Sequence, residues 1–105
     1  LVSVNRKRMV FVPNVIHLDA NNPANALAMI YGGPDVARIK HWVVYNRWGE
    51  RVFEARDFAP NDANFSWGGR IRNQTGHTDV YVWTAEIEFI DGETERFNGD
   101  ITLIR

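Results

Sequence analysis

The sequence has no cysteine, only two serines, almost no net charge and no long apolar run. Without cysteine it holds no disulfide framework, thiolate zinc site or cysteine nucleophile. The two serines, Ser3 and Ser66, stand outside any G-x-S-x-G elbow, so a serine-hydrolase signature is missing. A formal net charge of −1 argues against non-specific nucleic-acid binding, which needs a basic excess. No run approaches the roughly 18 apolar residues of a membrane-spanning helix.

What is present suits one folded domain. The chain has 105 residues, of which 45% are hydrophobic and 12% aromatic. A domain of this size buries roughly two-thirds of the surface that its unfolded chain exposes, so it folds without a covalent staple. We therefore treat residues 1–105 as a single domain. Because the chain starts at Leu1 rather than methionine, we expect it to be the tail module of a longer protein.

Short β-type runs alternate with turn signals along the chain. Val36–Tyr45 carries large apolar side chains on both faces, as a central strand does. Val80–Ile90 alternates between an apolar face and a more polar face, which is typical of a half-buried strand. About seven such strands predict an all-β fold, a single immunoglobulin-like antiparallel β-sandwich.

The turn signal Asp91–Gly92 contains a conflict. A two-residue loop there would set two glutamates opposite each other and turn Arg96 toward the core. We therefore predict a three-residue loop with a bulge, in a register that pairs Ile87 with Phe97.

The candidate metal ligands form only weak patterns. His77 and Asp79 flank Thr78 as a two-ligand pair that no recognisable spacing completes, so structural or exposed histidines are favoured. A polar loop offers oxygen ligands that would suit calcium; they are Asp19, Asn21 and Asn25. Only one of them is charged, and Asx side chains commonly cap their own loop. We therefore expect no metal and no cofactor.

The four tryptophans allow a second interpretation, a carbohydrate-binding β-sandwich module. Trp83 lies on the core face of its strand, whereas Trp48 and Trp67 stand near glycine-containing turns. Packing over a turn is the favoured explanation. A sugar-binding surface requires at least two exposed coplanar aromatic rings. No paired-carboxylate, phosphate-cradle or triad pattern stands out, so the residues indicate a binding or structural module and not an enzyme.

The most specific pattern is a series of short motifs in fixed order. They are F-V-P-N at 11–14, Y-N-R-W-G-E-R-V-F at 45–53, W-G-G at 67–69, D-V-Y-V-W at 79–83 and G-D-I-T-L-I-R at 99–105. With this order and spacing, residues 9–105 resemble the gliding-motility-associated C-terminal domain. That family is the type B sorting domain of the type IX secretion system in Bacteroides-like bacteria. The N-R-W-G stretch and the closing L-I-R are the most diagnostic parts.

The resemblance implies an address rather than a catalyst. Such domains direct large, adhesin-like secreted proteins through the periplasm to the outer membrane and the cell surface. The implied partners are the type IX secretion machinery and a PorP/SprF-like outer-membrane β-barrel protein, with no nucleic acid and no direct membrane insertion. We expect the isolated domain to be a monomer. A purely structural spacer domain is a third, weaker alternative.

The residues that match the family pattern are expected to serve the fold or recognition. They are Pro13, Asn14, Asn46, Arg47, Trp48, Gly49, Val52, Phe53, Trp67, Gly69, Tyr81, Gly99, Leu103, Ile104 and Arg105. A structural role is favoured for Asn46–Gly49, with Arg47 stacking on an aromatic ring or pairing with a carboxylate. A role in recognition is favoured for Arg105, and Ile101–Arg105 is a candidate edge for strand addition. Asp79 departs from the family pattern, which has glycine there.

Overall fold

The computed structural model describes residues 10–17, 27–71, 74–75 and 79–104, and most of them lie in strands. The strands are β1 (Val10–Phe11), β2 (Val15–His17), β3 (Tyr31–Gly32), β4 (Val36–Tyr45), β5 (Arg51–Phe58), β6 (Arg70–Ile71), β7 (Gln74–Thr75), β8 (Asp79–Phe89) and β9 (Thr94–Ile104). One 3-10 turn, Ala63–Phe65, follows β5, and the described residues include no α-helix. Nothing in this part of the chain forms a helix long and apolar enough to cross a membrane.

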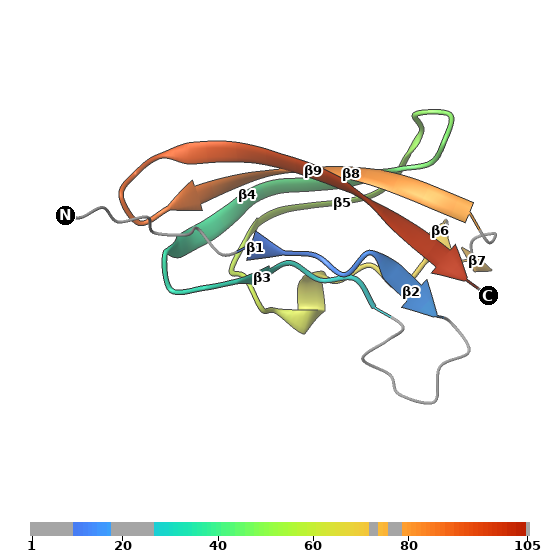
Figure 1. Cartoon of the computed structure of the whole chain (residues 1–105), viewed down its shortest axis with the longest axis horizontal. Coiled ribbons are helices and arrows are strands. Elements are labelled where there is room, and N and C mark those ends of the chain that lie inside the picture. The colour runs from blue at the N-terminus through green and yellow to red at the C-terminus, as the bar shows by residue number, and fades with distance from the viewer. Residues whose placement is uncertain (1–9, 18–26, 72–73, 76–78, 105) are drawn as a thin grey trace.

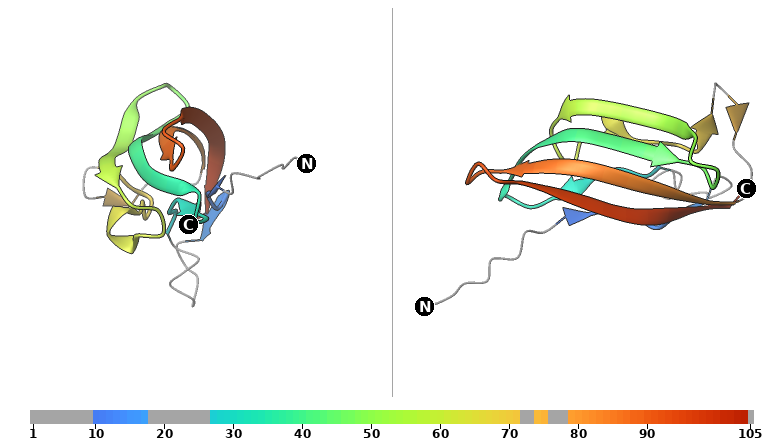
Figure 2. Two further views of the ribbon diagram at one scale, coloured as in Figure 1. Left: turned by 90° about the vertical axis from the view of Figure 1, so that its left-hand side faces the viewer. Right: turned by 90° about the horizontal axis from the view of Figure 1, so that it is seen from above.

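A five-stranded sheet in the order β2-β9-β8-β4-β5 dominates the molecule (Figure 1). The pairs β8–β9, β4–β8 and β4–β5 are antiparallel. The short pair β1–β3 lies on the opposite side of the core. An isolated antiparallel bridge joins Ala28 to Trp67. Seen from above and end-on, the long strands run side by side and curve around that core (Figure 2). The predicted all-β sandwich is confirmed.

Alternation along β8 explains the two layers. Its odd-numbered residues from Tyr81 to Phe89 are buried, and its even-numbered residues face outward. In β4, by contrast, the three consecutive residues Trp42–Val44 are all buried. β4 lies between β8 and β5, so its outward residue Val43 has Thr84 of β8 on one side and Glu54 of β5 on the other. The half-buried and central interpretations of these two strands are both confirmed.

The β8–β9 hairpin has a three-residue loop, as predicted, but a different register. The loop is Ile90–Gly92, and Gly92 takes φ +89°, the left-handed conformation of a G1 bulge. The predicted pairing of Ile87 with Phe97 is wrong, because Ile87 pairs with Glu95.

The position of Gly92 gives the physical reason for this register. A G1-bulge loop requires the left-handed residue at its third position, so the loop must begin two residues earlier, at Ile90. Ile90 follows the last buried residue of β8, Phe89, and is 69% exposed in the loop. The same register brings the Arg96 guanidinium to 3.3 Å from the Glu86 carboxylate, which removes the conflict of charges.

β2 lies beside the end of β9 and runs parallel to it. It pairs with residues 102–104, and the backbone N–H of Thr102 donates to the carbonyl of Asn14 at 2.8 Å. The prediction that Ile101–Arg105 is an edge open to strand addition is therefore wrong at Thr102 and Leu103, which have β8 on one side and β2 on the other, and β2 also pairs with Ile104. Arg105 lies outside the described residues.

Aromatic rings fill the space between the layers. Trp42, Trp67 and Trp83 are all buried. Trp67 meets Tyr81 edge-on with ring centroids 5.0 Å apart, and Trp42 meets Phe53 in the same way at 5.1 Å. The indole nitrogen of Trp42 is buried and has no hydrogen-bond partner among the described residues.

Candidate recognition surface

The turn between β4 and β5 is built by Asn46 and Gly49. The side-chain oxygen of Asn46 accepts hydrogen bonds from the backbone N–H groups of Trp48 and Glu50, each at 2.9 Å. Its side-chain nitrogen donates to the Glu50 carboxylate at 2.8 Å. Gly49 has φ +82°, and its N–H donates to the Asn46 carbonyl at 3.0 Å. These contacts fix the turn without using the side chains of Arg47 or Trp48.

Arg47 ties this turn to the start of β8. Its guanidinium donates to the Asp79 carboxylate at 2.6 Å and lies 5.3 Å from the centre of the Trp48 ring. The hydrogen bond to Asp79, together with the negative charge of Asp79, raises the pKa of Arg47 above its ordinary value. Asp79 also accepts from the N–H of Val80 at 2.8 Å. Both contacts predicted for Arg47, with a carboxylate and an aromatic ring, are confirmed.

Trp48 is the exception among the four tryptophans. Its exposed fraction is 74%, whereas those of Trp42, Trp67 and Trp83 are 0%, 2% and 7%. The favoured structural role therefore fits Asn46, Arg47 and Gly49 but not Trp48. The contacts of Asn46, Arg47 and Gly49 fix the turn in a conformation that leaves the Trp48 ring in water. Stability of the fold alone does not explain why such a large apolar ring is exposed.

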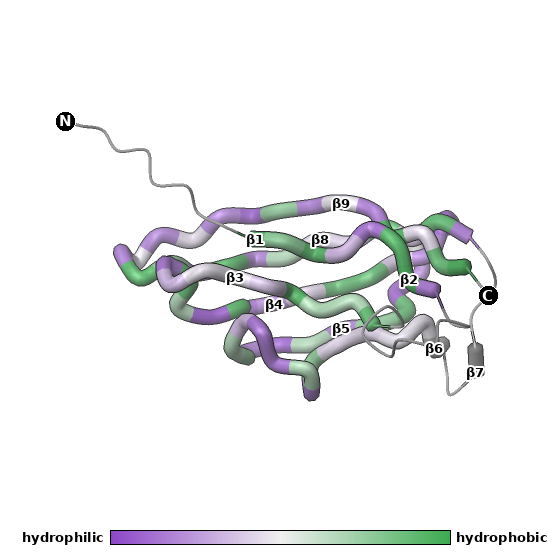
Figure 3. The backbone as a smooth tube through the Cα atoms, turned by 60° about the horizontal axis from the view of Figure 1, so that its bottom comes forward, coloured by the Kyte–Doolittle hydropathy of each residue, from purple (hydrophilic) through white to green (hydrophobic). Residues whose placement is uncertain are grey.

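Three exposed valines lie at the same end of the five-stranded sheet as this turn. Val80 and Val82 project from the outer face of β8, and Val15 from β2, each between 43% and 46% exposed. Val15, Thr102 and Val80 face one another in register across β2, β9 and β8. We call the set Trp48, Val15, Val80 and Val82 the apolar end. In Figure 3, most of β2, which carries Val15, has the colour of hydrophobic residues.

Sequence reasoning missed the three valines of the apolar end, although β8 carried a signal. Its outward positions continue with Thr84, Glu86 and Glu88, as a solvent face should. Val80 and Val82 break that polar pattern at one end of the strand. Val15 gave no comparable signal, because its position depends on the parallel pairing of β2 with β9.

Much of the rest of the outer face is charged, and several of these charges pair with one another. The ion pairs join Arg38 to Asp57 and Glu88, Glu54 to His41, Arg51 and Arg56, and Arg96 to Glu86, at 2.5–3.3 Å. The hydrogen bond with His41, followed by the charges of Arg51 and Arg56, holds the pKa of Glu54 below its ordinary value. Because these groups satisfy each other, the apolar end is the stronger candidate for contact with a partner.

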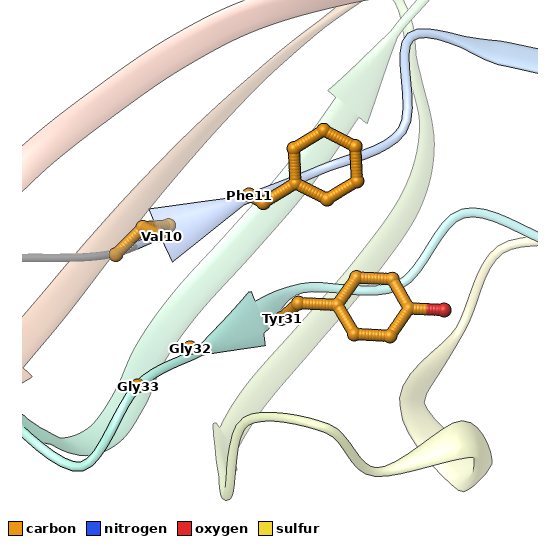
Figure 4. A pocket seen from close by; sticks show the side chains of 5 residues that line it. All are labelled: Val10, Phe11, Tyr31, Gly32 and Gly33. Atoms are coloured by element: carbon orange, nitrogen blue, oxygen red, sulfur yellow. The ribbon is translucent and has the colours of Figure 1, made fainter.

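Two further exposed aromatic residues line a groove on the opposite layer. Phe11 of β1 and Tyr31 of β3 are 61% and 37% exposed, and Val10, Gly32 and Gly33 complete the groove (Figure 4). The two ring centroids are 6.0 Å apart with an interplanar angle of 37°. The rings are therefore tilted and do not form the flat platform on which sugar-binding modules stack their ligands.

The other residues of the family pattern are spread over the fold. Val52 and Phe53 pack against the core from β5, and Trp67, Tyr81 and Leu103 are buried in it. Gly69 has φ +78°, and Asn14 contributes its carbonyl to β9. These residues serve the sandwich itself. Pro13 and Ile104 are partly exposed.

Some candidate ligands fall outside the described residues. They are Asp19, Asn21, Asn25 and His77, so the expectation that neither this loop nor the pair of His77 and Asp79 holds a metal stays a prediction. Within the part of the chain that the structure describes, no three His, Asp or Glu side chains gather as a metal site would require.

Comparison with protein-family models and with curated protein sequences finds no match to this chain. Among solved structures, the chain is similar to CopC from Methylosinus trichosporium OB3b, with a TM-score of 0.55. The sequence identity is 16%, over 91% of this chain and 94% of that chain. At this identity the likeness shows the β-sandwich fold and carries no information on the site.

Proposed function

We propose that this chain is a non-catalytic sorting domain of the type IX secretion system. It directs a secreted, adhesin-like cargo through the periplasm to the cell surface, and a PorP/SprF-like outer-membrane barrel protein binds it there. The motif series at 11–14, 45–53, 67–69, 79–83 and 99–105 supports this assignment. The sandwich fold is compatible with it, because a recognition module must stay folded in the periplasm.

The observation that carries the proposal is the exposure of Trp48 in a fixed turn. Asn46, Gly49 and Arg47 are satisfied within the molecule, so the most diagnostic motif leaves one side chain free for a partner. Tryptophan is enriched among the residues that dominate binding energy at protein interfaces. The valines of the apolar end would extend such a contact along the sheet.

The test is a reporter fused to this chain in a host that has the cognate barrel partner. We expect the wild-type fusion at the cell surface, and Trp48→Ala to lower surface display about tenfold or more, as loss of a central interface tryptophan does. Ile90→Ala is the matched control, because Ile90 is also a large exposed apolar residue but lies in the opposite hairpin.

The two possible failures are distinct. If the folded wild-type fusion stays in the periplasm, the sorting function is wrong. If Trp48→Ala reaches the surface as efficiently as Ile90→Ala, the sorting function stands but Trp48 does not contact the partner. Circular dichroism of the purified variants shows whether both retain the fold.

A carbohydrate-binding module is the second candidate. The groove beside Phe11 and Tyr31 favours it by holding two exposed aromatic rings, although these rings lack the coplanar arrangement expected of such a site. If sugars bind there, Tyr31→Ala abolishes the calorimetric signal of a binding oligosaccharide while Trp48→Ala preserves it. Absence of binding across a panel of surface polysaccharides contradicts this candidate.

A further inference from the structure

Glu54 of β5 lies among three side chains that can carry a positive charge. One of its carboxylate oxygens lies 3.1 Å from the guanidinium of Arg51. The other oxygen accepts a hydrogen bond from the Arg56 guanidinium at 2.7 Å and lies 2.5 Å from Nε2 of His41. The two arginines therefore share one carboxylate, whereas Arg38 on the same face of the sheet lies between two. We call Glu54, His41, Arg51 and Arg56 the Glu54 cluster.

The carboxylates next to this cluster, along β5 and across from it on β8, have contacts of their own. Asp57 accepts a hydrogen bond from Arg38 at 2.6 Å, and Glu50 accepts one from the amide of Asn46 at 2.8 Å. The carboxylate of Glu86 lies 3.3 Å from a guanidinium of β9. In the described contacts, the two guanidinium groups of the cluster thus carry one positive charge more than the carboxylate that they share.

The arginine side chains of the Glu54 cluster are more exposed than the carboxylate. The exposed fractions are 60% for Arg51 and 66% for Arg56, but 23% for Glu54. Each guanidinium has five N–H donors, and the described contacts of these two groups use one nitrogen atom each. Because the two oxygens of one carboxylate already reach both groups, the oxygens of a second anion can bridge them from the solvent side. The planar fork of arginine matches the oxygens of phosphate in this way.

A polar hollow of about 280 Å³ adjoins the Glu54 cluster on the outer face of the sheet. His41 belongs to both, and Val43 of the hollow pairs with Glu54 across β4 and β5. The hollow is lined by His41, Val43, Tyr45, Thr84, Glu86 and Arg96. Its lining offers two hydroxyl groups, an imidazole, a carboxylate and a guanidinium, which between them donate and accept hydrogen bonds. A small polar molecule therefore fits this lining better than an apolar one.

We propose that the Glu54 cluster binds the phosphate group of a small phosphorylated sugar, whose hydroxyl groups enter the adjacent hollow. A phosphate monoester carries a charge of about −1.5 to −2 at neutral pH and three strong acceptor oxygens, so it can satisfy both exposed guanidinium groups. A sugar supplies hydroxyl groups that both donate and accept hydrogen bonds, as the lining of the hollow does. The inference goes beyond the proposed sorting function and does not depend on it, because no residue of the apolar end takes part.

The first test measures the dissociation constant of glucose 1-phosphate by NMR titration at physiological ionic strength, where salt screens distant charges. We expect saturable binding by the wild type, weakened about fivefold or more by Arg51→Gln and by Arg56→Gln, because each removes one of the two cations. Arg38→Gln is the matched control, since Arg38 is an exposed arginine on the same face of the sheet but lies between two carboxylates. A wild-type titration that does not saturate, or an equal loss of affinity in Arg38→Gln, overturns the proposal.

The variant Glu54→Gln gives a test of opposite sign. It removes the carboxylate that competes with the ligand for both guanidinium groups and keeps the size of the side chain. Binding of glucose 1-phosphate should therefore become about fivefold tighter. If the cluster only stabilises the fold, this variant binds glucose 1-phosphate no better than the wild type, and that result contradicts the proposal. Thermal melting curves of the four variants establish that each is folded.

Separate ligands test the two parts of the site. Glucose 1-phosphate should bind more tightly than inorganic phosphate, and glucose more weakly than either. Thr84→Val should weaken binding of glucose 1-phosphate but not of inorganic phosphate, because Thr84 lines the hollow and is not in the Glu54 cluster. Equal affinities for glucose 1-phosphate and inorganic phosphate would overturn the role of the hollow. Equal affinities for glucose and glucose 1-phosphate would overturn the role of the arginines.

Discussion

The side chains of the turn Asn46–Glu50 have different tasks although they are adjacent in sequence. Asn46 and Gly49 shape the backbone, Arg47 bonds to another strand, and Trp48 stays in water. The sequence was sufficient to predict that Arg47 pairs with a carboxylate or an aromatic ring. It placed both Trp48 and Trp67 near glycine-containing turns and did not distinguish them, whereas the structure exposes Trp48 and buries Trp67.

Two glycines of the family pattern are required for different reasons, and substitution can separate these reasons. A Cβ atom at Gly49 would meet nothing within 4 Å, but the residue has φ +82°. At Gly99 the backbone is ordinary, but a Cβ atom would lie 2.9 Å from the Trp83 ring. Gly49 thus needs a left-handed backbone, and Gly99 needs space.

We expect Gly49→Asn to cost less than Gly49→Ala, because asparagine tolerates the left-handed region better than other residues. At Gly99 the order should reverse, since the larger side chain increases the clash, and Gly99→Ala should itself cost about 1–3 kcal/mol. Chemical denaturation of the four variants measures the free energy of unfolding. The same order of alanine and asparagine at both positions would contradict this explanation.

At the scale of elements, the β8–β9 hairpin shows how far local reasoning reaches. Charge alternation was enough to predict a three-residue loop. The register followed instead from the requirement that Gly92, as the left-handed residue, occupy the third loop position. The parallel partner of β9 was out of reach, because β2 is a three-residue strand near the other end of the sequence and has no distinctive pattern of its own.

The contacts of β5 with β4 predict a dependence of stability on acid. Because the folded-state pKa of Glu54 is lowered, this group stabilises the fold fully above its unfolded pKa of about 4.3, and the contribution is lost as the pH falls through the folded pKa. The variant Glu54→Gln has no carboxylate at this position, so its stability contains no such contribution to lose as the pH falls. The stability difference between wild type and Glu54→Gln should therefore shrink from pH 6 to about pH 3.

Melting temperatures across this pH range provide the measurement. Glu50→Gln is the control, because the partner described for Glu50 is the Asn46 amide rather than a cation. Its difference from wild type should change little with pH. A difference for Glu54→Gln that is equally constant would mean that His41, Arg51 and Arg56 do not stabilise the carboxylate in solution.

At the scale of the whole molecule, the alternating apolar pattern was sufficient to predict the sandwich, because burial of one face of each strand requires a second layer. The division of the outer face was not predictable in the same way. The apolar end is assembled from β2, β8 and the β4–β5 turn, and the charged part from β4, β5, β8 and β9. Most of these strands contribute only one or two residues, and strand order decides which of them become neighbours.

The pairing of β2 with β9 also sets the order in which this domain can fold. It joins residues 15–17 to residues 102–104, so nearly the whole chain forms the loop that this contact closes. Contacts between residues so distant in sequence are slow to form. A chain that emerges with its N-terminus first, from a ribosome or a membrane pore, has β1 to β8 outside before the strand that completes the sheet. Closure of the sheet therefore marks the arrival of the final strand.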